Sequence, residues 1–190
     1  SKTKKIRVVS HFDTDGITSA AIFSKTLTRW NKSFTLQIEK SLDQKIIESL
    51  PDNQILIFLD LASNSLSDLA KKNTEVFILD HHELTEPNSP IPNNIHMINP
   101  LLSNEDPICS SAICYLFAKT LSPKNTDLST LSVIGMVGDN QEKDISKTYD
   151  EIIKDSETTL KKGLLIYPST RPINKALEYS SNPYIPGVTG

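Results

Sequence analysis

The sequence predicts an α/β fold in which a doubly wound, mostly parallel, five-stranded sheet carries helices on both faces. Two observations predict it. Short apolar or β-branched runs alternate with longer segments of helical periodicity over the first 140 residues, and strands linked in this way pair in parallel. Acidic residues also follow several of these runs directly, and the sites of open α/β sheets lie at the carboxyl ends of their strands.

The first elements follow from composition and from residues that end helices. Residues 6–10 are a β-branched run, which predicts a buried strand. Residues 17–30 continue with helical periodicity, and residues 34–39 predict a second strand. Residues 42–50 predict a helix that ends where Pro51 prevents its continuation.

The centre of the chain continues the alternation. Residues 55–59 predict a third strand, and residues 65–72 predict a short helix for which Ser65 is a suitable N-cap. Residues 76–79 predict a fourth strand. After a loop rich in Pro and Asn, residues 96–98 predict the fifth strand.

Two further helices are expected at residues 109–121 and 128–137. They complete a predicted domain of residues 1–140, which contains all the candidate metal ligands described below. We therefore expect this part of the chain to be the catalytic domain.

The chain changes in character after residue 140. Residues 144–162 are charged and predict a helix, and residues 164–167 are a short apolar run. Residues 180–190 contain prolines and glycines, which favour an extended segment or linker. We expect residues 141–190 to be a helical and extended continuation that leads toward a further domain.

Bulk properties narrow the functional classes. The net charge of −3 gives no global basic field, which is weak evidence against a nucleic-acid partner because a local groove can still bind phosphates. Two cysteines are too few for a disulfide framework and favour two packed thiols. No apolar run approaches the roughly 20 residues of a membrane span, so we expect a cytoplasmic protein without a membrane partner.

Carboxylates and imidazoles gather where the predicted strands end. The tripeptide Asp80-His81-His82 follows the fourth strand and Asp60 follows the third. Asp139 follows an apolar helix and two glycines, from where it can reach back toward this edge. The residues expected along the edge itself are His11, Asp13, Asp15, Asp60, Asp80 and His81.

This concentration of acidic residues predicts a metal site. Five aspartates on one edge would repel one another unless cations neutralise them. Mixed Asp and His ligands suit manganese, zinc or iron, and two ions about 4 Å apart form a clamp for phosphoryl chemistry. Asp13 and Asp15 also fit a plain turn and helix cap, whereas a calcium loop lacks its further oxygen ligands and glutamate.

Four ordered motifs resemble the DHH phosphoesterase superfamily, whose members include RecJ exonucleases, family II pyrophosphatases, nanoRNases and cyclic-dinucleotide phosphodiesterases. The motifs are HFDTDG (11–16), Asp60, the tripeptide at 80–82, and Gly138-Asp139. The strings SHFDTDGITSA, LDHHE, GMVGDNQ and STRPINKALEYSSNPYIPG are similar to archaeal RecJ-like nucleases, including the GINS-associated nuclease. The resemblance implies that the chain is an N-terminal portion, without the second domain called DHHA1 that usually follows and helps to grip substrate.

The resemblance also implies roles for single residues. Asp60 would bridge two metal ions, with Mn²⁺ expected and Mg²⁺ or another divalent ion possible. Asp80 would orient an imidazole, and His82 would contact the scissile phosphate. The ligands of individual ions would be Asp13 for one, and Asp15, His81 and Asp139 for the other.

One position departs from part of the superfamily. Pyrophosphatase-type members carry a metal histidine four residues before the first aspartate of motif one, where this chain has Val9. The histidine here is His11, two residues before Asp13, and it is a candidate either as a ligand or as a residue that orients one. The departure argues against a pyrophosphatase.

Three further residues are candidates for binding substrate. Ser110 and Ser111 begin a predicted helix, where they fit either an N-cap or a phosphate held at the helix N-terminus. Arg171 is one of three arginines, and it fits either a substrate phosphate or a structural role.

The sequence thus predicts a two-metal phosphodiesterase that acts on single-stranded DNA or RNA as an exonuclease. One alternative is a replication scaffold with little activity that binds GINS, because the superfamily has members in the eukaryotic replicative helicase that have lost metal ligands. Another is a phosphodiesterase for oligonucleotides or cyclic dinucleotides.

Overall fold

The structure is a computed structural model that describes residues 5–85, 89–103, 105–143, 145–161, 172–180 and 184–189. The apolar run at 164–167 and the candidate substrate ligand Arg171 lie outside these residues. The described part of the chain forms two compact units, Ser1–Thr158 and Thr159–Gly190. The domain boundary expected at residue 140 stays a prediction.

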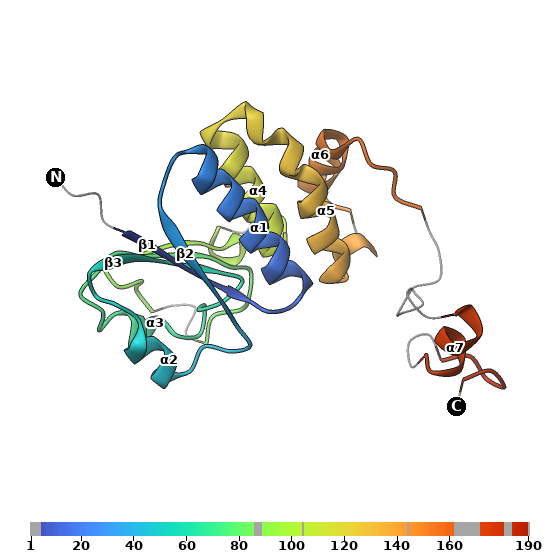
Figure 1. Ribbon diagram of the computed structural model, residues 1–190, viewed down its shortest axis with the longest axis horizontal. Helices are drawn as coiled ribbons and strands as arrows, with labels where there is room; N and C mark the ends of the chain where they lie inside the picture. The colour runs from blue at the N-terminus through green and yellow to red at the C-terminus, as the bar shows by residue number, and fades with distance from the viewer. Residues whose placement is uncertain are drawn as a thin grey trace. The chain divides into compact units, whose positions relative to one another are not determined.

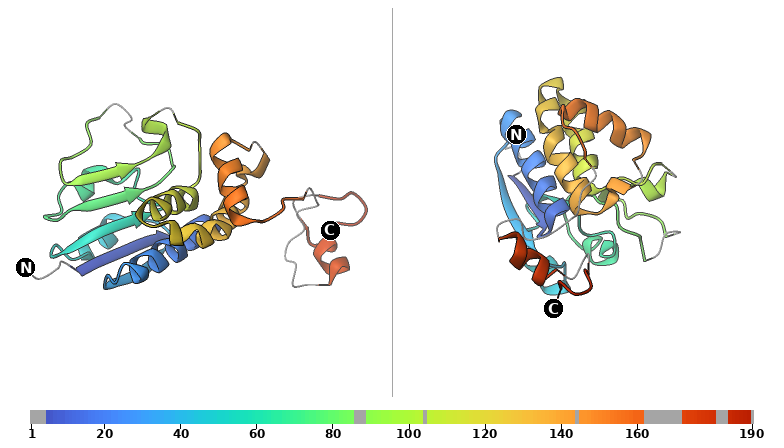
Figure 2. Two further views of the ribbon diagram at one scale, coloured as in Figure 1. Left: turned by 90° about the horizontal axis from the view of Figure 1, so that it is seen from above. Right: turned by 90° about the vertical axis from the view of Figure 1, so that its right-hand side faces the viewer.

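Five parallel strands form one sheet in the order β2-β1-β3-β4-β5. Their arrows run in the same direction (Figure 2). This confirms the predicted fold class. The strands are β1 Lys5–His11, β2 Phe34–Glu39, β3 Gln54–Leu59, β4 Val76–Leu79 and β5 Ile95–Ile98.

Helices cover both faces of the sheet (Figure 1). Two short helices lie on one face, α2 Gln44–Ser49 and α3 Leu66–Leu69. The larger layer lies on the other face and comprises α1 Thr14–Arg29, α4 Ser110–Leu121, α5 Ser129–Gly138 and, packed against α5, α6 Lys147–Ser156. Short 3₁₀ helices lie at Pro100–Leu102, Pro123–Leu128 and Gln141–Lys143, and the second unit contains α7 Ile173–Glu178.

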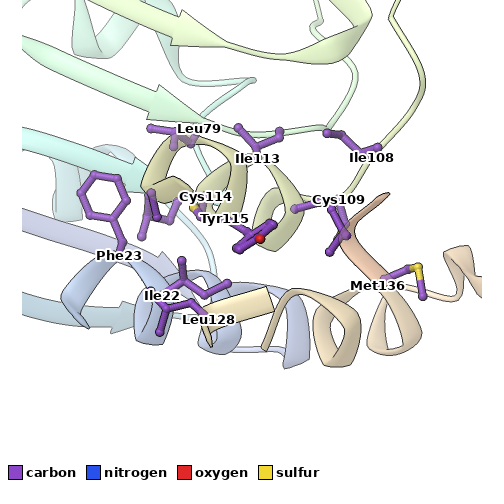
Figure 3. Packing of buried hydrophobic residues seen from close by; sticks show 14 of the residues in the cluster. Ile22, Phe23, Leu79, Ile108, Cys109, Ile113, Cys114, Tyr115, Leu128 and Met136 are labelled. Carbon is purple, nitrogen blue, oxygen red and sulfur yellow. The ribbon is translucent and has the colours of Figure 1, made fainter. Parts of the chain in front are cut away.

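Each face of the sheet has its own hydrophobic core, because side chains alternate along a strand. On β1, Val8 packs into the cluster beneath α1 and α4, and Val9 packs into the cluster beneath α2 and α3. Figure 3 shows the larger cluster, to which β4 contributes Leu79 and α4 contributes Ile113 and Cys114. Both cysteines of the chain are free and buried, as the sequence predicts.

Several helix limits differ from the predicted ones because of capping. Helix α1 begins three residues earlier than expected, since the Asp13 carboxylate accepts a hydrogen bond from the Gly16 amide (2.9 Å). Helix α6 is shorter than the predicted 144–162: Ser146 caps its start, and Glu157 ends it in a left-handed conformation (φ 54°). Helix α3 also falls short of residues 65–72, and Ser65 takes the N-cap position without a capping side-chain bond.

The segment predicted to be extended or a linker contains a turn in the residues that the structure describes there. Residues 185–189 form a turn, in which the amides of Val188 and Thr189 both donate to the Ile185 carbonyl (3.1 and 2.9 Å). The Thr189 hydroxyl also donates to the carbonyl of Leu177 in α7 (3.2 Å). Among the described helices, none has both the length and the apolar character that crossing a bilayer requires.

Candidate metal centre

The candidate site lies at the carboxyl edge of the sheet, around the ends of β1 and β3. The chain leaves β1 toward β2 on one side, and β3 leads to β4 and β5 on the other, so this is the point where the strand order reverses. Loops diverge at such a point and leave room for a ligand. His11 ends β1, Asp60 follows β3, and Asp80 follows β4.

One group of possible ligands consists of His11, Asp13 and Asp60, whose donor atoms lie within 4.8 Å of one another. The His11 Nδ1 atom is 2.9 Å from Asp13 Oδ2 and 3.4 Å from Asp60 Oδ2. Because Asp13 Oδ1 caps α1, its other oxygen is held toward His11. The histidine two residues before Asp13 thus lies with the predicted ligands.

A second group consists of Asp60, His81 and His82. The His81 Nε2 atom lies 3.4 Å from Asp60 Oδ1, 3.7 Å from Asp139 Oδ2 and 3.9 Å from Asp15 Oδ2. The structure therefore brings Asp15 and Asp139 to the same imidazole as Asp60. Asp60 belongs to both groups, with Oδ2 toward His11 and Oδ1 toward His81.

Asp60 is almost fully buried, at 1% exposure, in a group of like charges. Burial raises the pKa of Asp60 to about 6, and the nearby charges of Asp15 and Asp13 act in the same direction. Burial likewise raises the pKa of Asp139. The backbone at Asp60 is also left-handed (φ 58°), a conformation that is costly for most residues and is concentrated at functional sites.

The buried polar atoms of the site fit divalent metal ions. Among the described residues, His11 Nδ1, Asp60 Oδ2 and His81 Nε2 are buried without a hydrogen-bond partner of acceptable geometry. A buried polar atom without a partner is costly, and both imidazole nitrogens face the Asp60 carboxylate. Cations bound between them would satisfy all three, and the Asp and His set suits a transition metal such as manganese.

Asp15 is held by the N-terminus of α4. Its Oδ2 accepts a hydrogen bond from the Ser110 amide (2.7 Å) and its Oδ1 accepts one from the Ser111 amide (2.9 Å). The Ser110 hydroxyl donates to Asp60 Oδ1 (3.0 Å). The two amides at this helix N-terminus thus bind the Asp15 carboxylate. Binding of a substrate phosphate by Ser110 and Ser111 stays a prediction.

Asp80 orients its neighbours from a fully buried position. Its Oδ2 accepts hydrogen bonds from the amide and hydroxyl of Ser63 (2.9 and 2.6 Å), and its Oδ1 lies 2.7 Å from His82 Nδ1. These bonds outweigh burial and lower the pKa of Asp80 to about 2, while Asp80 raises the pKa of His82 to about 9. Asp80 thus holds His82, whose side chain is half exposed.

Sequence reasoning did not find several supporting residues. Ser63 and Asn99 hold the tripeptide, since the Asn99 side-chain amide donates to the His82 carbonyl (2.9 Å). Gln141 donates from Nε2 to Asp139 Oδ2 (2.5 Å), and Tyr149 donates to Gln141 Oε1 (2.5 Å). The sequence signal that could have pointed to Gln141 is its place in the string GMVGDNQ, which is similar to archaeal RecJ-like nucleases.

A cleft of about 260 Å³ opens beside the metal ligands. Its lining includes His11, Asp60 and His82, together with Lys40 and the residues that follow it. The cleft therefore places a cationic and several hydroxyl-bearing residues next to the acidic centre.

Comparison with known proteins agrees with this geometry. Residues 5–149 match the family model described as the DHH family, N-terminal domain. The chain is 33% identical over 195 residues to the uncharacterized protein MJ0831 of Methanocaldococcus jannaschii, and the match covers 96% of this chain and 45% of that protein. The chain thus spans less than half the length of this curated relative.

Two solved structures share the fold. One is the exonuclease RecJ bound to manganese (TM-score 0.67, 17% identity, 80% of this chain and 43% of RecJ covered). The other is Cdc45 from Entamoeba histolytica (TM-score 0.60, 20% identity, 80% and 33% covered). With the family model and a five-stranded parallel sheet like that of RecJ, the chain belongs to the DHH family and its first unit has the RecJ-like fold of that family's N-terminal domain.

Proposed function

We propose that this chain carries the catalytic centre of a metal-dependent phosphodiesterase that releases nucleotides from single-stranded DNA or RNA. The observation that carries the proposal is the pair of ligand groups that share Asp60. Among their atoms, His11 Nδ1, Asp60 Oδ2 and His81 Nε2 are buried without a hydrogen bond of acceptable geometry. An exonuclease of the same fold has been solved with manganese bound.

In this proposal, one ion would be held by His11, Asp13 and Asp60, and the other by Asp60, Asp15, His81 and Asp139. His82 is not assigned as a ligand, because the Nδ1 atom that lies near Asp60 is already engaged by Asp80. Two bound cations supply activation of water and neutralisation of the charge that develops on the phosphate oxygens. The chain's own task is to hold six side chains in place before substrate arrives. Capping by Asp13 and the amides of α4 around Asp15 support that task.

His82 is proposed to contact the scissile phosphate. Since Asp80 engages its Nδ1, the ring is fixed and its Nε2 is left for substrate. The hydrogen bond with Asp80 raises the pKa of His82, which favours the protonated imidazole, and a cation next to a phosphate is stabilising. The cleft lined by Lys40 would receive the adjoining part of the strand.

The proposal is tested with end-labelled single strands of DNA and RNA in the presence of Mn²⁺. Wild-type protein should shorten one or both from an end, and EDTA should stop the reaction. Asp60→Ala serves as the negative control, because it removes the shared ligand. If the 190-residue chain binds Mn²⁺ but neither it nor any longer natural chain that contains it cleaves either substrate, the exonuclease proposal fails.

A second candidate function is a replication scaffold that binds GINS, and the likeness to Cdc45 favours it. The presence of every proposed metal ligand speaks for activity, and the two functions can coexist. Capture of purified GINS by wild-type protein and by Asp60→Ala distinguishes them. Equal capture by both, without cleavage by either, would support the scaffold.

A further inference from the structure

A buried tyrosine outside the metal centre is linked to it by hydrogen bonds. Tyr149 lies on α6 and is 1% exposed. Its hydroxyl is 2.5 Å from Gln141 Oε1 and 2.7 Å from the amide nitrogen of Cys109. Gln141 in turn lies 2.5 Å from Asp139 Oδ2 through Nε2.

The direction of each bond follows from the groups themselves. The Cys109 amide can only donate, so the Tyr149 oxygen accepts from it. The single hydroxyl proton of Tyr149 is then left for Gln141 Oε1. This arrangement turns the amino end of the Gln141 side chain toward Asp139, where it donates to the carboxylate. The tyrosine therefore selects one of the two orientations of the glutamine amide.

The same hydroxyl is connected to Asp15 through the start of α4. Cys109 is the N-cap residue of that helix, and its side chain makes no capping bond. Three consecutive amides at this point have defined partners: Cys109 donates to Tyr149, and the next two donate to the oxygens of Asp15. Tyr149 thus fixes the Cys109 amide, which directly precedes the two amides that bind Asp15.

We propose that Tyr149 is a positioning residue that sets Asp15 and Asp139 together around His81, through α4 on one side and through Gln141 on the other. This inference rests on the proposed metal centre. Both carboxylates approach the same His81 Nε2 atom, at 3.9 and 3.7 Å, so a single hydroxyl aligns two of the ligands of one ion. Outer partners of this kind tune metal affinity by orienting the ligands.

The test is Tyr149→Phe, which removes the hydroxyl and keeps the ring in the core. Titration calorimetry with MnCl₂ should show that one of the two ions binds roughly 10–100-fold more weakly, the range for loss of an outer partner, while the other binds unchanged. Nuclease activity should need a correspondingly higher Mn²⁺ concentration for half-activation and should approach the wild-type maximum at saturation.

Tyr115→Phe is a matched control. Tyr115 is also fully buried, but its hydroxyl donates to Asp155 (2.6 Å), away from the metal ligands. This variant should lose thermal stability as Tyr149→Phe does and bind Mn²⁺ as the wild type does. If both variants lose stability and both bind two ions with wild-type affinity, Tyr149 is structural only and the inference is wrong.

Gln141→Ala keeps the inference testable if Tyr149→Phe does not fold. Gln141 is only partly buried, and its truncation removes the direct contact with Asp139. This variant should bind the same ion more weakly. Wild-type Mn²⁺ affinity in this variant would contradict the proposed link from Tyr149 through Gln141 to Asp139. Failure of the wild-type protein to bind Mn²⁺ at all would instead refute the proposed metal centre, so the two failures are separable.

Discussion

Asp60 is the residue that links the two groups of possible metal ligands. It is buried, its backbone is left-handed, and each of its carboxylate oxygens faces a different histidine. An uncompensated carboxylate here would be unfavourable, which agrees with its raised pKa of about 6. Bound divalent ions would lower the pKa of Asp60 again, because they stabilise the charged carboxylate.

A comparison of Asp60→Ala with His82→Ala should therefore separate effects on metal binding from effects on the cleavage rate. Asp60→Ala should abolish binding of both Mn²⁺ ions in calorimetry, because both ligand groups contain this residue. His82→Ala should retain both ions and lose roughly 10²–10³-fold in cleavage rate, the range for removal of one group that stabilises transition-state charge.

His96→Ala is the matched control for His82→Ala. The His96 side chain is 52% exposed and lies 2.7 Å from Glu75, and the His82 side chain is 51% exposed and lies 2.7 Å from Asp80. His96 lies on β5, away from the metal ligands, so its loss should change neither binding nor rate. Loss of metal in His82→Ala would show that His82 is a ligand and would overturn its assignment.

At the scale of secondary-structure elements, α5 must approach α1 and α4 very closely to deliver Asp139. A Cβ atom at Gly135 would lie 2.0 Å from Ser111 Oγ and 2.6 Å from Thr18 Oγ1. Helices come this close only where one of them lacks a side chain. The glycine therefore sets the position of the helix whose C-cap residue is Asp139.

Gly135→Ala should lower the free energy of unfolding by about 1–3 kcal/mol, the usual cost of overpacking, even though alanine favours a helix. Chemical denaturation monitored by circular dichroism measures this. The double variant with Ser111→Ala removes the nearest clashing atom, so its loss should be smaller than the sum of the single losses. Additive losses would show that the contact with Ser111 does not limit the packing.

The sequence was sufficient to predict these elements where the signal is local. Each strand was located to within one residue at either end, because apolar runs and strand-ending residues lie next to each other in the chain. Helices α3 and α6 were predicted too long, because charged residues continue helical periodicity beyond the caps that end it. The strand-end aspartates were likewise visible, since parallel strands share one carboxyl edge.

Contacts between distant residues were not predictable in the same way. The hydrogen bonds from the start of α4 to Asp15 join residues 95 and 96 positions apart, whereas the pattern of Ser110 and Ser111 suggests only an N-cap or a phosphate site. The hydrogen bond from Tyr149 to Gln141 depends on how α6 packs against α5, which no local sequence pattern specifies. Such contacts depend on how distant segments pack together, and no short stretch of sequence encodes that packing.

At the scale of the whole first unit, a partly buried ion pair between Lys119 and Asp155 joins α4 and α6. Asp155 of α6 accepts hydrogen bonds from the Tyr115 hydroxyl (2.6 Å) and from Lys119, both on α4. Burial opposes ionisation of Asp155, but the bonds from Lys119 and Tyr115 outweigh it and lower the pKa of its carboxyl. The folded state therefore favours the charged form.

The sign of the pH dependence follows from this lowered pKa. The stabilisation from Asp155 is fully present above the unfolded-state pKa, near 4, and is lost as the pH falls through the lower folded-state value. Asp155→Asn should reduce the free energy of unfolding by roughly 1–2 kcal/mol at pH 6, and the difference from wild type should shrink toward pH 2. Urea denaturation at several pH values measures it.

Asp150→Asn is the control, because Asp150 is also on α6 and pairs with a lysine, but its side chain is 54% exposed. An exposed pair of this kind contributes little to stability, so this variant should follow the wild type closely. If the difference between Asp155→Asn and wild type stays constant down to pH 2, the lowered pKa of Asp155 is not the cause.

The spread of the metal ligands along the chain has a consequence for biosynthesis. The proposed ligands run from His11 at the end of the first strand to Asp139 after α5, and all of them are needed at one edge of the sheet. A nascent chain that has emerged only as far as β5 contains most of these residues but can form neither the grip on Asp15 nor the approach of Asp139. Metal should therefore bind late, after α4 and α5 have left the ribosome. The bound ions should then stabilise a domain that has already folded and slow its unfolding.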